Sequence, residues 1–415
     1  MTRRAGAPRT TRVSRSSRDP YGLGPAANYI GPVVAAVALV LVAVVTVNLM
    51  NGQLPIGGGS RNGNGGPGPV RTPAPSNVVI PEPEASFPGS LVYAKSGNIW
   101  VQTADDVRQL TDSGRDSMPS FSFDGETVYF IRETVGKALW PVDGRRTWYD
   151  LVTPEVASVP ADGSSVPEQV VSGRIRSGNN QWFAWMRQPV VSPDGGTIAL
   201  TTDITAPGEG VVLHFLDPET KEFTRIDVAQ SSGLGHQDPA WEPLGRYVAF
   251  VKNGREGSRG APQILKYNPE NGRSFTITGP GYLSPAWSPD TNYLAATRTD
   301  SFGTDVVILD GTTGAELLRV TDDDASFSPV WSPAGDAIAY LHLQGTIVDL
   351  KMARLEGETG RWTVAETVAL TNVSGLDAAS RSAWFVPPSE LPDPTPSPPP
   401  SVSPEGPSGP ASAAP

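Results

Sequence analysis

The stretch between Pro119 and Pro189 gathers aromatic and basic side chains whose types could bind a ligand. Its candidate contact residues are Trp140, Arg145, Arg146, Trp148, Trp182 and Trp185. Aromatic faces and guanidinium groups together can bind a sugar, an anionic polymer or a loop of a protein partner. The alternative is structural, a long hairpin whose aromatic rings pack over the rim of the domain. The composition alone keeps both interpretations open.

Residues suited to catalysis are sparse. The chain has no cysteine, which excludes thiolate chemistry and disulfides. Its three histidines, His214, His236 and His342, do not share a metal-binding motif, and no Gly-x-Ser-x-Gly elbow occurs. The run Asp322 to Asp324 could bind a cation weakly, but a solvated acidic turn is the usual explanation for such a run. We therefore predict no catalytic residue, no metal and no cofactor.

A repeated motif sets the framework for these residues. Six copies begin at Pro119, Pro189, Pro239, Pro285, Pro329 and Ser382, at spacings of 70, 50, 46, 44 and 53 residues. A copy such as Pro285-Ala286-Trp287-Ser288-Pro289-Asp290 combines a short apolar strand with a tight turn, and further strands follow. The last strand commonly ends in an apolar residue and threonine, as at Val320-Thr321. Four strands at this spacing predict one blade of a β-propeller.

The sixth copy contains only one strand before Pro387-Pro388. Three strands without a first one lie upstream, at 91–94, 98–102 and 107–111. We expect these N-terminal strands to complete the C-terminal blade, which would close the ring and remove exposed sheet edges. The predicted fold class is therefore all-β, a six-bladed propeller of four-stranded blades.

The copies resemble the WD-like repeats of TolB-type propellers, whose consensus is Pro-x-Trp-Ser-Pro-Asp-Gly, over about Leu91 to Pro387. Departures from the consensus are Phe121 and Val191 for Trp, Glu242 for Ser, Thr291 for Gly and Ala334 for Asp. The resemblance implies a binding role in a cell-envelope complex. It does not imply a shared partner, because TolB-type proteins have an additional N-terminal domain where this chain has a membrane segment and a tether.

A second candidate site follows from the propeller. Residues just before each first strand line the mouth of the central channel in such folds, and polar and aromatic groups converging there could bind a ligand. They are Arg115, Asp116, Gln181, Trp182, His236, Gln237, Asp238, Tyr282, Phe327 and Arg381. The alternative is a water-filled channel with satisfied polar loops. His236 and Asp238 could form an acid–base pair there or belong to such a loop.

The tryptophans that recur once per repeat have a different expected role. Trp241, Trp287, Trp331 and Trp384 occupy the same position of four copies. A large ring at a fixed position is what packing neighbouring sheets requires, so we interpret them as structural.

Outside the propeller the sequence predicts an anchor and two linkers. Residues 29–50 carry no charge and are long enough for a transmembrane helix, although a cleaved signal peptide is the alternative. Six arginines precede the segment, so residues 1–28 should be cytoplasmic and the propeller outside. Residues 51–88 form a Gly/Pro-rich linker, 89–387 the propeller, and 388–415 a Pro/Ser-rich tail that should be disordered.

Charge narrows the choice of partners. The formal net charge is −11, and the chain after the first 19 residues has 26 basic against 42 acidic side chains. Such a body does not favour nucleic-acid binding. We expect a non-catalytic, membrane-anchored propeller that binds a protein or a cell-envelope polymer. The alternative is a propeller enzyme, a polysaccharide lyase or hydrolase, with its site at the channel mouth.

Overall fold

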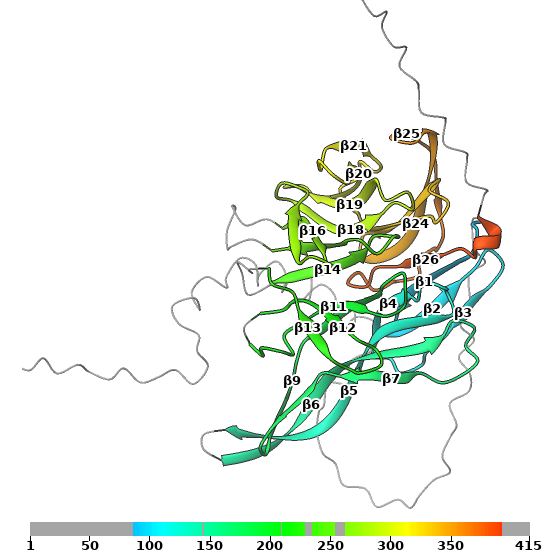
Figure 1. Ribbon diagram of the computed structural model, residues 1–415. Helices are drawn as coiled ribbons and strands as arrows, with labels where there is room; N and C mark the ends of the chain where they lie inside the picture. Colours follow the sequence, from blue (N-terminus) through cyan, green and yellow to red (C-terminus); the bar gives the residue numbers. More distant parts are fainter. Residues whose placement is uncertain (1–85, 143–144, 209, 229–234, 254–261, 392–415) are drawn as a thin grey trace, which may run out of the picture. The chain divides into compact units, whose positions relative to one another are not determined.

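The computed structural model describes residues 86–391 except 143–144, 209, 229–234 and 254–261. Six antiparallel four-stranded sheets and one two-stranded sheet make up this part of the chain (Figure 1). The first strand of each sheet contacts the first strand of the next, and β22 contacts β26. The six sheets therefore form a closed ring, which confirms the predicted propeller.

The strands are assigned to blades in ring order. Blade 1 contains β26 (Ala383–Phe385), β1 (Ser90–Lys95), β2 (Asn98–Gln102) and β3 (Val107–Gln109). Blade 2 contains β4 (Asp116–Phe121), β5 (Thr127–Val142), β6 (Arg145–Pro160) and β7 (Glu168–Ser172). Blade 3 contains β10 (Met186–Val191), β11 (Ile198–Thr202), β12 (Val212–Leu216) and β13 (Phe223–Arg225), and blade 4 contains β14 (His236–Trp241), β15 (Val248–Lys252), β16 (Gln263–Asn268) and β17 (Arg273–Thr276). Blade 5 contains β18 (Tyr282–Trp287), β19 (Tyr293–Thr299), β20 (Thr304–Asp310) and β21 (Glu316–Arg319), and blade 6 contains β22 (Ser326–Trp331), β23 (Ala337–Gln344), β24 (Ile347–Glu358) and β25 (Arg361–Ala369). The two-stranded sheet contains β8 (Arg174–Ser177) and β9 (Asn180–Phe183).

Ring closure uses both ends of the described chain. Strand β26 pairs antiparallel with β1, with Leu91 opposite Trp384. The indole N–H of Trp384 donates to the carbonyl of Pro88 at 2.9 Å, and its ring meets Phe87 edge-on at 5.8 Å. The expectation that N-terminal strands complete the C-terminal blade is confirmed.

In three blades the turn at the Ser-Pro-Asp-Gly position of the repeat is held by the serine side chain. In Ser122, Ser192 and Ser288 the hydroxyl donates to the aspartate two residues later and accepts the backbone N–H five residues later, at 2.9 to 3.0 Å. Glu242 replaces serine in blade 4, where its carboxylate accepts from the backbone and the guanidinium of Arg246. A different side chain therefore holds the same turn.

Buried hydrophobic clusters fill the six junctions between neighbouring blades. Trp287, Trp331 and Trp384 belong to three of these clusters, and the partly buried Trp241 packs against a fourth. Burying aromatic rings between sheets removes a large apolar area from water at each junction.

The predicted anchor lies outside the described residues, as do nearly all of the predicted linker and most of the predicted tail. Within the residues that the structure describes, helical geometry is confined to the short 3₁₀ turn η2 (Pro388–Glu390), and no helix there has the length and apolarity to cross a bilayer.

Candidate functional site

The 70-residue repeat unit builds a projecting ribbon from β5 and β6. These strands pair from Thr127 opposite Pro160 to Val142 opposite Arg145, whereas β4 pairs with β5 only as far as Arg132. Strand β7 likewise pairs with β6 only as far as Glu155. Residues 134–142 and 145–153 therefore extend beyond blade 2 as a two-stranded arm (Figure 1).

One face of the arm is covered by the hairpin of β8 and β9. Strand β9 lies against both β5 and β6, and Leu151 and Ala138 on this face are buried. The hydroxyl of Tyr149 donates to the carbonyl of Gln181 at 2.5 Å. Arg174 donates to the Lys137 carbonyl at 2.8 Å and to the Gln181 side chain, with Nε at 3.0 Å. The bonds of Tyr149 and of the Lys137 carbonyl fasten the cover to the arm, and the bond between Arg174 and Gln181 joins the two strands of the cover.

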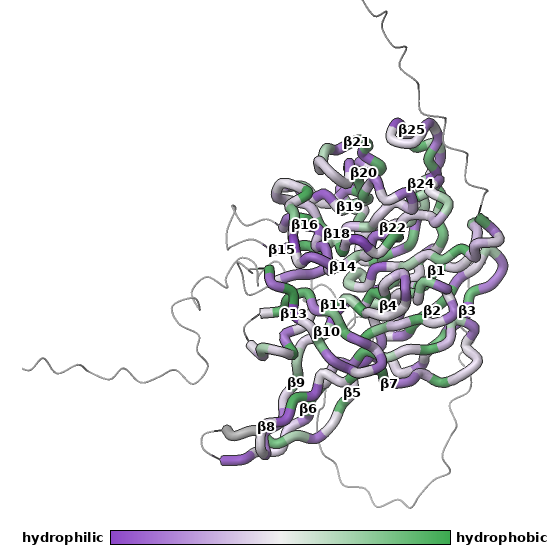
Figure 2. Tube along the Cα trace, viewed as in Figure 1, coloured by the Kyte–Doolittle hydropathy of each residue, from purple (hydrophilic) through white to green (hydrophobic). Residues whose placement is uncertain are grey.

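The opposite face, which we call the open face, carries Val135, Lys137, Leu139, Trp148, Asp150 and Val152. The side chains of Trp148, Val135 and Val152 are 65%, 49% and 38% exposed. Lys137 and Asp150 form an ion pair at 2.5 Å between these apolar positions. Figure 2 shows hydrophobic residues along the arm where it stands clear of the propeller. The arm thus presents apolar surface that no described part of the chain covers.

The aromatic and basic residues predicted from the sequence are separated by this arrangement. Trp148 lies on the open face, whereas Trp182 is a partly buried residue of β9. Trp185 is 54% exposed at the base of blade 3, where it meets Phe183 edge-on at 5.1 Å. Arg145 and Arg146 are exposed near the end of the arm, and Arg146 donates to the side-chain oxygen of Asn179 at 2.7 Å in the amide orientation that satisfies both groups. The side chain of Trp140 lies outside the described residues.

At the centre of the ring, the residue before each repeat proline has a positive φ. The φ angles of Met118, Gln188, Asp238, Ser284 and Ser328 lie between 48° and 55°, and the pairing of each first strand shifts register there. This left-handed conformation is unfavourable for residues other than glycine, so hydrogen bonds must compensate for it.

Asp238 lies at the middle of that hydrogen-bonding network. Its carboxylate accepts from the Gln188 side chain and from the backbone N–H and hydroxyl of Ser284, both at 3.0 Å. Its own backbone N–H donates to Gln188 Oε1 at 2.7 Å. Asp238 therefore links blades 3, 4 and 5 and is already engaged by protein groups.

Arg381 crosses the centre of the ring. It precedes β26 of blade 1, yet its guanidinium donates to the carbonyls of Pro239 in blade 4 and Pro285 in blade 5, at 2.9 and 3.0 Å. Burial lowers the pKa of Arg381, and the negative charge of Asp238 opposes that shift. The side chain thus joins the ring-closing segment to the opposite side of the propeller.

His236 does not reach the channel network. Its ring is buried against Phe250, with centroids 4.8 Å apart, and its Nδ1 accepts from the backbone N–H of Leu213 at 3.2 Å. Burial, with Lys252 second, lowers the pKa of His236 to about 3. A neutral histidine held between blades 3 and 4 does not form the hypothesised acid–base pair, since Asp238 bonds elsewhere.

The other predicted channel residues have separate surroundings. Tyr282 Oη lies 3.5 Å from Glu316, and Phe327 packs against the core between blades 6 and 1. Gln237 is partly buried in β14. Asp116 forms a bidentate ion pair with Arg132, at 2.7 and 2.8 Å.

Placing Gln181 and Trp182 just before a first strand was wrong. The first strand of blade 3 begins only at Met186, because the hairpin of β8 and β9 occupies the preceding residues. The sequence shows that the unit is long, but not that part of the extra length forms a separate hairpin.

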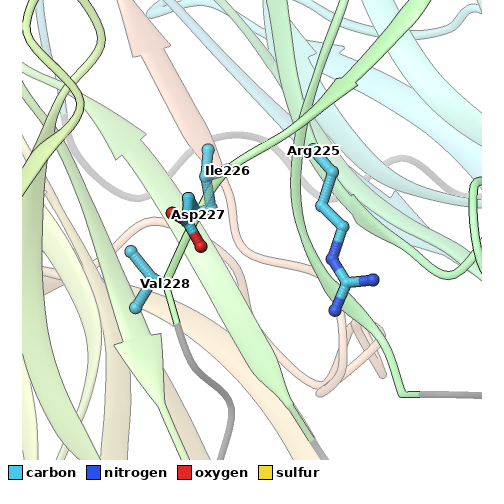
Figure 3. A pocket seen from close by; sticks show the side chains of 4 residues that line it. All are labelled: Arg225, Ile226, Asp227 and Val228. Carbon is cyan, nitrogen blue, oxygen red and sulfur yellow. The ribbon is translucent and has the colours of Figure 1, made fainter.

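A small depression, which the sequence did not indicate, follows β13. Its volume is about 270 Å³ and it is lined by Arg225, Ile226, Asp227 and Val228 (Figure 3). Its lining ends at Val228, after which the described part of the chain resumes only at Gly235. Among the described residues, no group of three or more His, Asp or Glu side chains could hold a metal ion.

Comparison with known proteins supports the fold. No family model matches this chain. TolB from Acinetobacter baumannii is similar in structure over 72% of this chain and 67% of its own length, with 18% identity and a TM-score of 0.51. A TolB-type protein from Agrobacterium tumefaciens is similar over 74% of this chain and 96% of its own length, with 14% identity and a TM-score of 0.49. An oligogalacturonate lyase from Vibrio parahaemolyticus is similar over 66% of this chain and 89% of its own length, with 13% identity and a TM-score of 0.41. The described part of the chain therefore has the fold of a TolB-like six-bladed β-propeller.

Proposed function

We propose that this chain is a non-catalytic binding module that contacts a protein partner through the open face of its arm. A transmembrane helix over residues 29–50 would hold the propeller outside the membrane. The observation that carries the proposal is the exposure of Trp148, Val135 and Val152 on a ribbon whose other face is firmly covered. Large exposed apolar side chains grouped on one face are typical of interaction sites.

The chemistry of the open face favours a protein over a cell-envelope polymer. The charges of Lys137 and Asp150 cancel on this face, and Arg146, which the same alternation places there, is bonded to Asn179, so the face does not cluster positive charge as a polyanion site would. Valine and leucine side chains also provide none of the hydrogen bonds that fix a sugar. Protein interfaces combine an aromatic anchor with apolar neighbours, and on this face Leu139 lies directly opposite Trp148.

The alternative of catalysis at the channel mouth has less support. Three of the charged groups predicted there, Asp116, Asp238 and Arg381, are occupied by hydrogen bonds within the protein. A general acid or base needs an atom within hydrogen-bonding reach of a substrate.

Capture experiments with the full-length protein test the proposal. Wild type, Trp148→Ala and the control Phe302→Ala would be used to retain proteins from solubilised membranes. Phe302 is 84% exposed in the loop between β19 and β20, so its variant removes an exposed ring that is not on the arm. We expect Trp148→Ala to lower partner retention about tenfold or more, the effect of losing an anchor residue.

Folding and binding are separated by thermal melts of the same samples, which should agree among the three proteins. Equal retention by wild type and Trp148→Ala would refute the proposal. Retention that is lost on glycan digestion but unaffected by Trp148→Ala would point to a polymer instead.

A further inference from the structure

We infer that the partner of the open face is the open face of a second copy of this chain, related by a twofold axis parallel to the arm. This inference rests on the proposed function, because it names the occupant of the same surface.

Three consecutive rows of the open face carry the argument, each made of two residues that lie directly opposite in the β5–β6 register, and the next row towards the end of the arm pairs Pro141 with Arg146. The three rows are Val135 with Val152, Lys137 with Asp150, and Leu139 with Trp148. All six side chains lie on one face because successive residues of a strand alternate between faces. An ion pair is therefore flanked on both sides by apolar pairs.

Two copies of this face match each other in charge and in apolar character under only one of two possible twofold axes. A twofold axis along the arm places β5 of one copy over β6 of the other. Lys137 then faces Asp150 of the second copy, and each apolar row faces the same row of the second copy. A twofold axis across the arm would place Lys137 over Lys137 and Asp150 over Asp150. Like charges facing each other disfavour association, so the charges select the first arrangement.

The selected arrangement has a structural consequence. With the axis along the arm, both propellers lie at the same end of the paired arms. Two chains anchored in one membrane, as proposed above, keep the same orientation under this axis if the arm points along the membrane normal.

The area of the face predicts a weak dimer. Nine residues per strand give an arm of about 30 Å, and two strands about 5 Å apart give a face of a few hundred Å². Stable interfaces bury roughly 800 Å² on each partner. Association should therefore depend strongly on concentration, which anchoring in a common membrane would raise.

Charge reversal on the full-length chain tests the inference. Lys137→Glu gives the face two acids, and Asp150→Lys gives it two bases. We expect each single variant to self-associate at least about tenfold more weakly than wild type, because every facing charge is then repulsive. Mixing the two variants should restore association as a heterodimer, and the double variant Lys137→Glu/Asp150→Lys should associate like wild type.

The measurement is sedimentation velocity in detergent from micromolar to near-millimolar protein. Matched controls are Arg273→Glu and Glu270→Lys, which make the same changes in net charge at exposed positions of blade 4 and should leave association at the wild-type level.

Three outcomes would overturn the inference: a monomeric wild type throughout this range, single variants that associate like wild type, or a mixture that does not associate. If one of these occurs while Trp148→Ala still reduces capture of another protein, only the second copy is refuted. If Trp148→Ala changes neither readout, the proposed function fails as well.

Discussion

At the scale of single residues, a threonine hydroxyl completes the sheet in four blades. It accepts a backbone N–H from the third strand, at 2.8 to 2.9 Å. The donor and acceptor residues are Ile99 and Thr111, Ile264 and Thr278, Val306 and Thr321, and Leu350 and Thr371. A buried N–H without such an acceptor would be destabilising, which explains the apolar-Thr ending of these repeats.

Blade 3 lacks this threonine, and His236 replaces it. In the four blades that have the threonine, the apolar residue just before it donates its backbone N–H to a carbonyl of the third strand. Ile226 donates to the Leu213 carbonyl in the same way, but the residue after Ile226 is Asp227 and not a threonine. The N–H of Leu213 therefore donates to His236 Nδ1 from the neighbouring blade. His236 must stay neutral to accept this bond.

The neutrality of His236 predicts acid sensitivity. Its pKa is lowered from 6.5 to about 3 on folding, mainly by burial, so between these values the unfolded chain binds a proton that the folded chain does not. The unfolding free energy should then fall as the pH decreases from 6.5 towards 3, by up to about 1.4 kcal/mol per pH unit. Urea denaturation of wild type and His236→Gln at a series of pH values measures the difference in slope. Identical slopes would contradict this role.

The sequence could not reveal this role of His236. It lies two residues before Asp238 and three before Pro239, which places it at the channel mouth in a linear alignment. The left-handed turn at Asp238 and the missing threonine of another blade decide its contacts instead. Both are properties of the packed ring, whereas the repeat itself and the ring closure follow from local spacing.

At the scale of elements, the arm shows why the insertion was harder to predict than the blades. Apolar residues occur on both of its faces, with Ala138 and Leu151 on one and Val135 and Val152 on the other. Alternation alone therefore does not tell which face is covered. The cover comes from β8 and β9, later in the chain, and only the folded structure brings it onto one face.

Loosening the cover should free the arm without unfolding the propeller. Arg174→Met removes the bonds to the Lys137 carbonyl and the Gln181 side chain, and we expect amide exchange in 134–138 and 149–153 to accelerate about tenfold or more. The control is Arg176→Met, an exposed arginine of the same strand. Hydrogen exchange followed by mass spectrometry makes the comparison, and equal exchange in both variants would show that Arg174 does not hold the cover.

At the scale of the whole molecule, the two ends of the propeller are joined twice. Strand β26 adds to β1, and Arg381 just before it reaches the carbonyls of Pro239 and Pro285 across the ring. The first contact completes a sheet and buries Trp384, whereas the second joins blade 1 to the far side of the ring. A closed ring has no free first or last blade, so a break at this point should weaken all six junctions together.

Deleting Ser382 to Phe385 tests this closure. The deletion leaves the edge of β1 unpaired and removes Trp384 from its cluster, and losing a buried tryptophan alone costs about 3–5 kcal/mol. We expect the melting temperature of the full-length chain to fall by roughly 10 °C or more, and that of Arg381→Met to fall by less. Trp148→Ala serves as the control, because its side chain lies on the arm and contributes to none of the six clusters. A deletion variant that melts with wild type would mean that the ring does not depend on its closing strand, and the stability of the propeller would then have to reside in its individual blade junctions.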